Sequence, residues 1–303
     1  MVTKEESRVM MRFHKEPLGY RVFQCFNFVV MLLMVCITVY PFLFVIAQSL
    51  SSSGAIYAGK VTIWPVEPNL LSYRAVMRNP DFYISYRNTL MYVVLGTGLS
   101  LALSCMLAYP LSKPRLKIQK VLTPFIIFTM FFIPGMIPNY ILVSSLKLRN
   151  TIWAVLLPGA INTYYILIMR SFFSSIPAEL EEAAAIDGMN TYGIFFRIVL
   201  PLSAPILSTM LLFYGVDIWN QWFNAFIYLD NKSLFPVALY LRGLIMSVAG
   251  AREAGAESYS DNAQIETTIR SCAIVLTCLP IMCIYPFIQK YFVKGMMIGS
   301  VKG

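Results

Sequence analysis

The side chains that could do acid–base or metal chemistry are few, and their placement argues against an enzyme. Three carboxylates stand close together in the chain, at Glu181, Glu182 and Asp187. The single histidine, His14, lies far from them in a basic N-terminal segment. A nucleophile–histidine pair is therefore not expected, because the only histidine is remote and near the terminus. A histidine-based metal site is not expected either, because there is no second histidine. We expect this chain to have no catalytic residues, no metal and no bound cofactor.

One stretch has the spacing of a phosphate-binding loop without its chemistry. Residues 54–60 read G-x4-G-K, but the next residue is Val61, where such a loop needs a hydroxyl to hold magnesium. Pro65 interrupts any helix that would follow. We interpret the match as chance. If the chain takes part in active transport, ATP and Mg²⁺ must bind to a separate subunit.

The composition is that of a polytopic membrane protein. Hydrophobic residues make up 58% of the chain and charged residues only 13%, against about a quarter in soluble domains. The formal net charge of +9 could indicate nucleic acid binding, but the charges fall between apolar runs, as at membrane flanks. We therefore expect a lipid bilayer and no nucleic acid. The six cysteines lie in apolar runs without a C-x-x-C pair, which indicates core thiols.

Six apolar runs predict an all-α protein with six transmembrane helices. The third run contains three prolines and is expected to be kinked. A basic segment, 1–21, precedes the first run, and a tail, 293–303, follows the last. The first segment and the loop 113–120 are densely basic, which places both termini and the Glu182 loop in the cytoplasm. The spans are expected at 22–48, 89–108, 121–144, 151–169, 202–223 and 271–292, with exterior segments at 49–86 and 224–269.

The second apolar run carries a row of small residues. Gly96, Ser100 and Ser104 recur at four-residue spacing and share one helical face. Small residues let helix backbones approach closely in lipid, so this face is expected to pack against another helix.

A polar stretch between the fourth and fifth runs, about 177–197, predicts two short helices with a bend. Pro177 suits a first turn, and the early glutamates suit the positive end of a helix dipole. Gly188 is the residue best suited to a left-handed cap, after which Asn190 or Thr191 can cap a second helix through Phe196. Such an element between apolar spans predicts a docking surface for a soluble partner; the alternative is an ordinary pair of surface helices.

The spacing E-A-A-x3-G-x9-I-x-L-P, from Glu182 to Pro201, resembles the EAA signature of bacterial ABC importer permeases. This resemblance implies the type I permease fold, with a cytoplasmic coupling helix in a cleft of an ATPase subunit. Alanine and glycine would give close contact, and the carboxylates would give charge and capping. The ATPase-coupling residues that it implies are Glu182, Ala183, Ala184, Asp187, Gly188, Leu200 and Pro201.

The glycine-rich end, 292–303, resembles the carbohydrate, maltose-type branch of these permeases, and more narrowly its LplC-like subgroup. That resemblance implies a permease subunit of an ATP-driven oligosaccharide importer in a bacterial inner membrane. The implied partners are a second homologous permease, two cytoplasmic ATPase subunits and an external solute-binding lipoprotein. The alternatives are a permease for another solute, such as an amino acid or a polyamine, a secondary transporter or channel, and a non-transporting scaffold.

Two polar sets inside predicted spans are candidates for a substrate path. Polar groups in a span are costly unless they face protein or a water-filled cavity. The polar residues of the fifth span, from Asp217 to Asn224, recur at i, i+3, i+4 and i+7, which predicts one helical face near the outer mouth. Sugar binding is the functional interpretation, and hydrogen bonding between helices is the alternative. The candidates are Asn162, Tyr164 and Tyr165 in the fourth span, and Asp217, Asn220, Gln221 and Asn224 in the fifth.

Overall fold

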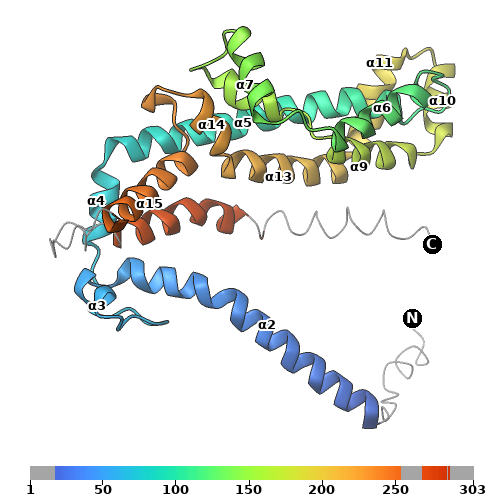
Figure 1. Ribbon diagram of the computed structural model, residues 1–303. Helices are drawn as coiled ribbons and strands as arrows, with labels where there is room; N and C mark the ends of the chain where they lie inside the picture. The colour runs from blue at the N-terminus through green and yellow to red at the C-terminus, as the bar shows by residue number, and fades with distance from the viewer. Residues whose placement is uncertain (1–17, 254–267, 285, 287–303) are drawn as a thin grey trace.

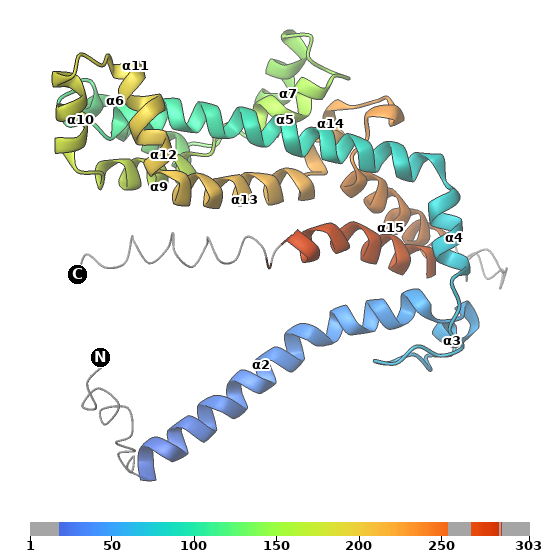
Figure 2. The ribbon, with the colours of Figure 1, turned by 180° about the vertical axis from the view of Figure 1, so that it is seen from behind.

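The computed structural model describes residues 18–253, 268–284 and 286, and these form helices and connecting loops without a β-strand. Two helices are long and apolar enough to cross a bilayer alone, α2 (Leu18–Leu50) and α5 (Pro80–Leu111). Figures 1 and 2 show α5 running the length of the main body, beside α13 (Ala204–Asn220) and α9 (Thr163–Ser174). The helix α5 is therefore the central support of the fold.

Three bent pairs of helices are each apolar enough, taken together, to form a span. α6 (Gln119–Phe131) and α7 (Met136–Ser145) meet at 112°. Gly135, between them, has φ 86°, and it follows Pro134, so the predicted kink of the third span is confirmed. The helical stretch Ile152–Gly159 and α9 meet at 55°, and Thr191–Leu202 and α13 meet at 79°.

By length and composition, two helices could cross a membrane, or up to five if each bent pair is one span. The first two predicted spans lie within α2 and α5, although α5 begins earlier than predicted, at Pro80. The sixth, 271–292, overlaps the helix Thr268–Ile284, and nearly all of its remainder lies outside the described residues. The same is true of the N-terminal segment before Leu18 and of the tail 293–303.

Short helices connect the long ones. α3 (Ser53–Tyr57) and α4 (Leu71–Arg78) join α2 to α5, and α8 (Ile152–Leu156) with η1 (Leu157–Gly159) leads into α9. After α13 come α14 (Phe223–Tyr228), η3 (Lys232–Leu234) and α15 (Val237–Glu253). The sequence did not predict α15, which falls within the segment 224–269 that was expected to be exterior, where Arg242 interrupts the apolar residues.

The small-residue face of α5 packs as predicted. Ser100 and Ser104 are buried, and Ser104 Oγ lies 2.6 Å from the Tyr214 hydroxyl of α13. A Cβ on Gly96 would lie 2.8 Å from side-chain atoms of both Ile218 and Leu156. Only glycine allows this approach without a shift of its neighbours.

The N-terminal helix α2 stands away from the main body in Figures 1 and 2. Its buried residues are Ala47 and Ser49, at its C-terminal end, and its most apolar stretch is entirely unburied within this chain. An apolar surface of this length requires lipid or another protein to cover it.

Candidate functional site

The polar stretch between the fourth and fifth runs forms four consecutive elements, which we call the α10–α12 segment (178–202). They are α10 (Ala178–Ile186), α11 (Thr191–Ile194), the π-helix η2 (Phe195–Val199) and α12 (Leu200–Leu202). Gly188 has φ 84°, so the predicted left-handed cap is confirmed. Asn190 caps α11, and its Oδ1 accepts a hydrogen bond of 2.8 Å from the Gly193 N–H.

The second half of this segment is longer than predicted. The expected end at Phe196 is wrong, because the π-helix continues the chain into α12 as far as Leu202. Pro201 lies inside α12, and the next long helix begins at Ala204, after a bend at Ser203.

Large apolar side chains of the α10–α12 segment are exposed at one extremity of the molecule, where Figure 1 shows α10 and α11. Ile186 is 86% exposed and Tyr192 is 77% exposed. Leu180 and Phe196 are exposed as well. Exposed apolar side chains gathered on one element indicate a surface that another protein covers.

The residues that the EAA resemblance singled out do not all face outward. Ala184 is only 3% exposed and belongs to the main core, beside Phe173 and Phe195. The expectation that Ala184 supplies contact with a partner is therefore corrected: it packs α10 onto its own chain. Leu200 is half-buried, and the exposed members of the set are Glu182, Ala183, Asp187, Gly188 and Pro201.

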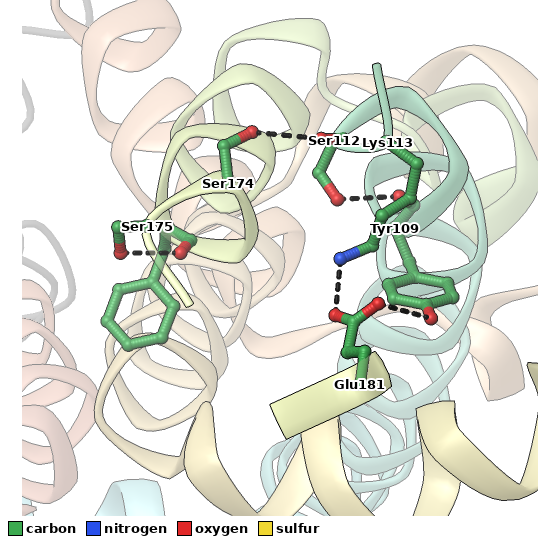
Figure 3. Close-up of polar contacts among 7 residues, drawn as sticks. Tyr109, Ser112, Lys113, Ser174, Ser175 and Glu181 are labelled. Atoms are coloured by element: carbon green, nitrogen blue, oxygen red, sulfur yellow. Dashed lines mark hydrogen bonds and ion pairs between the residues drawn. The ribbon is translucent and has the colours of Figure 1, made fainter. Parts of the chain in front are cut away.

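Two glutamates of α10 form ion pairs with the loop that follows α5. Lys113 donates to Glu181 Oε1, and the Tyr109 hydroxyl lies 3.4 Å from Glu181 Oε2 (Figure 3). The side chains of Lys113 and Glu181 are only 24% and 16% exposed. Arg115 donates to Glu182, but that pair is open to solvent. The sequence reading treated Lys113 and Arg115 only as membrane-flanking charges.

At the C-terminal end of α5, side chains of other elements donate hydrogen bonds to the backbone carbonyl groups that the helix leaves unpaired. Arg170 Nε and Gln119 Nε2 each donate a hydrogen bond of 2.8 Å to the Leu111 carbonyl. Ser174 Oγ donates to the Ser112 carbonyl at 3.3 Å, as Figure 3 shows. This end of α5 is therefore tied to α9 and α6 as well as to α10.

A second polar site, the polar cavity, lies where α9 begins and α13 ends. Its volume is about 60 Å³. Three of the substrate-path candidates, Asn162, Asp217 and Gln221, gather at it. The lining residues are Ser100, Leu156, Gly159, Asn162, Tyr214, Asp217, Ile218 and Gln221.

Hydrogen bonds fix the polar groups around this cavity. Asn162 caps α9, and its Oδ1 accepts from the Tyr164 and Tyr165 N–H groups at 3.0 and 3.4 Å. The Tyr165 hydroxyl donates to Asp217 Oδ2 at 2.8 Å. Tyr165 thus orients the carboxylate that the cavity presents.

The remaining candidates lie elsewhere, and the prediction of one helical face is wrong. α13 ends at Asn220, and Gln221 has an extended backbone with ψ 112°. The break turns Gln221 into the cavity, while exposed Asn220 donates to its own helix at the Val216 carbonyl. Asn224 lies in α14, 3.5 Å from the Val155 carbonyl, and Tyr164 is 55% exposed.

Comparison with known proteins decides the family. Residues 89–227, which include both the α10–α12 segment and the cavity, match the family described as the binding-protein-dependent transport system inner membrane component. Protein LplC of Bacillus subtilis (strain 168) is 38% identical over 283 residues, covering 93% of this chain and 96% of LplC. The chain belongs to this family.

Two further relatives extend the comparison. The polygalacturonan/rhamnogalacturonan transport system permease protein YtcP of Bacillus subtilis (strain 168) is 38% identical over 278 residues, 92% of this chain and 96% of YtcP. A crystal structure of a bacterial ABC transporter that imports the acidic polysaccharide alginate contains a chain 33% identical to this one. Its TM-score is 0.83, and the match covers 91% of this permease and 98% of that chain. The predicted family and the type I ABC permease fold are confirmed.

The permease also has a cation–aromatic contact, between Arg242 and Trp222, that the sequence did not predict. The Arg242 guanidinium carbon lies 3.6 Å from the centre of the Trp222 ring, next to cavity-lining Gln221. Trp222 lies in the break between α13 and α14, and Arg242 lies in α15, 20 positions further on, so no local spacing connects them. Within the described part of the permease, no three His, Cys, Asp or Glu side chains could hold a metal ion.

Proposed function

We propose that this chain is the transmembrane permease subunit of an ATP-driven ABC importer for an oligosaccharide. The observation that carries the proposal is the near full-length, 38% identity to YtcP, which is named for polygalacturonan and rhamnogalacturonan transport. The likeness to a chain of the alginate importer supports the same class of substrate. The protein itself does no chemistry; ATP and Mg²⁺ bind to a partner ATPase.

In this proposal the α10–α12 segment is the cytoplasmic coupling helix, and both termini lie in the cytoplasm. The exposure of Ile186 and Tyr192 supports this role, because a cleft of an ATPase would cover them. Gly188 sets the bend, and exposed Ala183 leaves room for close approach. Glu182, Asp187, Leu200 and Pro201 remain predicted members of the contact.

The polar cavity is proposed as a narrow part of the substrate path. A volume of about 60 Å³ holds a few water molecules, since one needs about 10–15 Å³, but it is far below the ~300 Å³ of a small ligand pocket. Transport therefore requires the cavity to widen. A second homologous permease would complete its wall, and an external solute-binding lipoprotein would deliver the sugar. Asn162, Asp217 and Gln221 would meet the sugar first, and Tyr164, Tyr165, Asn220 and Asn224 remain candidates nearby.

Uptake in a deletion strain tests this function. The strain would be complemented with the wild-type gene and given labelled oligosaccharides from polygalacturonan, alginate and neutral polysaccharides, alongside an amino acid and a polyamine. We expect loss of uptake of one oligosaccharide class only, restored by complementation and abolished by deletion of the partner ATPase. Loss of amino acid or polyamine uptake instead would favour the other permease class. Oligosaccharide uptake that needs no ATPase would favour a secondary transporter.

A further inference from the structure

The contact between α10 and α5 is half-buried and has three members. Glu181 accepts from Lys113 at one carboxylate oxygen, and the Tyr109 hydroxyl approaches the other (Figure 3). The Lys113 ammonium also lies 4.8 Å from the centre of the Tyr109 ring. Two opposite charges and an aromatic face thus meet between two helices.

The surroundings of this contact are packed rather than open. Tyr109 is 8% exposed, and its ring lies 4.8 Å from the ring of Phe195 in η2. Removal of one partner would leave the other charge largely shielded from water, which costs more than loss of an exposed pair. The neighbouring Arg115–Glu182 pair is the opposite case, with side chains 83% and 50% exposed.

A single continuous helix connects this contact to the polar cavity. Tyr109 lies in the last turn of α5, and Ser100, on the same helix, lines the cavity. Nine residues at 1.5 Å each separate them by about 14 Å. Midway, Ser104 of α5 meets Tyr214 of α13, which also lines the cavity.

We propose that Glu181, Lys113 and Tyr109 form a clasp that makes α10 and α5 move together, so that a displacement of α10 reaches the cavity. They are positioning residues: they touch neither the sugar nor the ATPase. The inference rests on the proposed function, because it assigns a route to the motion that an ATPase would impose. It differs from the EAA resemblance, which points to Glu182 and leaves Glu181 without a role.

The test uses the complete transporter with its own ATPase, reconstituted in nanodiscs. The six native cysteines are replaced, and Gln221→Cys reports on the cavity through its rate of labelling by a hydrophilic maleimide, with and without ATP and vanadate. The variants are Glu181→Gln, Glu181→Lys, Lys113→Glu and the exchanged pair, Glu181→Lys with Lys113→Glu. Arg149→Gln is the matched control, because it breaks the exposed Arg149–Asp230 pair at 3.1 Å, outside the clasp.

In the wild type and in Arg149→Gln, trapping with vanadate should change the labelling rate. In Glu181→Gln the change should shrink about tenfold, a typical size for coupling between two sites. ATPase binding and basal ATP hydrolysis should persist there, and the exchanged pair should recover most of the response.

A normal response in Glu181→Gln would overturn the clasp. Loss of the ATPase from that variant would overturn it as well, because the residue would then act in docking. The clasp would also be overturned if the exchanged pair showed no larger change in labelling rate than the single variants. A wild-type complex that contains no ATPase, or shows no response to nucleotide, would contradict the proposed function itself, before any clasp variant is considered.

Discussion

The α10–α12 segment and the polar cavity are built in different ways. Around α10, opposite charges join separate elements, and Ala184 and Tyr109 pack in one apolar core. Around the cavity, helices end or bend, at Gly159 and Asn220, and polar groups are held by caps and single hydrogen bonds. The first region is therefore held by packing and charge between separate elements, whereas the second depends on helix ends and single hydrogen bonds.

The largest expected effect comes from Gly188→Val in the α10–α12 segment. Gly188 has φ 84°, and a Cβ there would meet nothing within 4 Å, so the effect acts through the backbone alone. A β-branched residue in this conformation costs about 1–3 kcal/mol, which should redirect α11 and abolish ATPase binding and uptake. Capture of the ATPase on the tagged permease, together with uptake, measures it.

Gly188→Asn is the matched control, because asparagine tolerates the left-handed region. It should retain both activities. Normal ATPase capture and uptake in Gly188→Val would show that the geometry of the bend does not matter for docking.

A smaller effect is expected from Gly96→Leu, which tests whether the cavity depends on the close packing of α5 against its lining residues. The new side chain would collide with Ile218 and Leu156, both of which line the cavity. Overpacking of this kind costs about 1–3 kcal/mol, so Tm of the purified permease should fall by several degrees. Gly98→Leu, on the same helix with nothing within 4 Å, should leave Tm unchanged. Equal shifts in the two variants would contradict the packing account.

The smallest effect is expected from Tyr165→Phe at the cavity. The change removes the 2.8 Å hydrogen bond to Asp217 and keeps the ring. Because Asp217 is exposed and water can replace the hydroxyl, the loss should be about 1 kcal/mol, or about fivefold in uptake. ATPase capture should be normal. Tyr164→Phe, at an exposed neighbour, is the control; an equal loss there would mean that the Asp217 contact has no special role.

The sequence predicts the α10–α12 segment better than the cavity, for a physical reason. The Gly188 cap and the Asn190 cap depend on residues within a few positions, so local spacing identifies them. The prolines of the third span mark its break in the same way. The EAA spacing also led to the correct family.

Features that depend on packing could not be predicted. Lys113 and Glu181 are 68 positions apart, and no spacing rule relates them. The burial of Ala184 depends on helices that surround α10 only in the fold. The apparent face from Asp217 to Asn224 assumed one continuous helix, whereas the chain turns at Gln221. The residue that the turn carries into the cavity could be found only from the structure.

The most direct test of the central claim is crosslinking from the exposed end of the α10–α12 segment. A photoreactive amino acid would replace Ile186 or Tyr192 in the intact membrane complex, and Ile137, 68% exposed on α7, would be the control. The account predicts that the first two positions crosslink to a nucleotide-binding subunit and that the control does not. Absence of an ATPase from the products at both positions, or its equal capture from Ile137, would contradict the assignment of this segment as the site where ATP hydrolysis drives the permease.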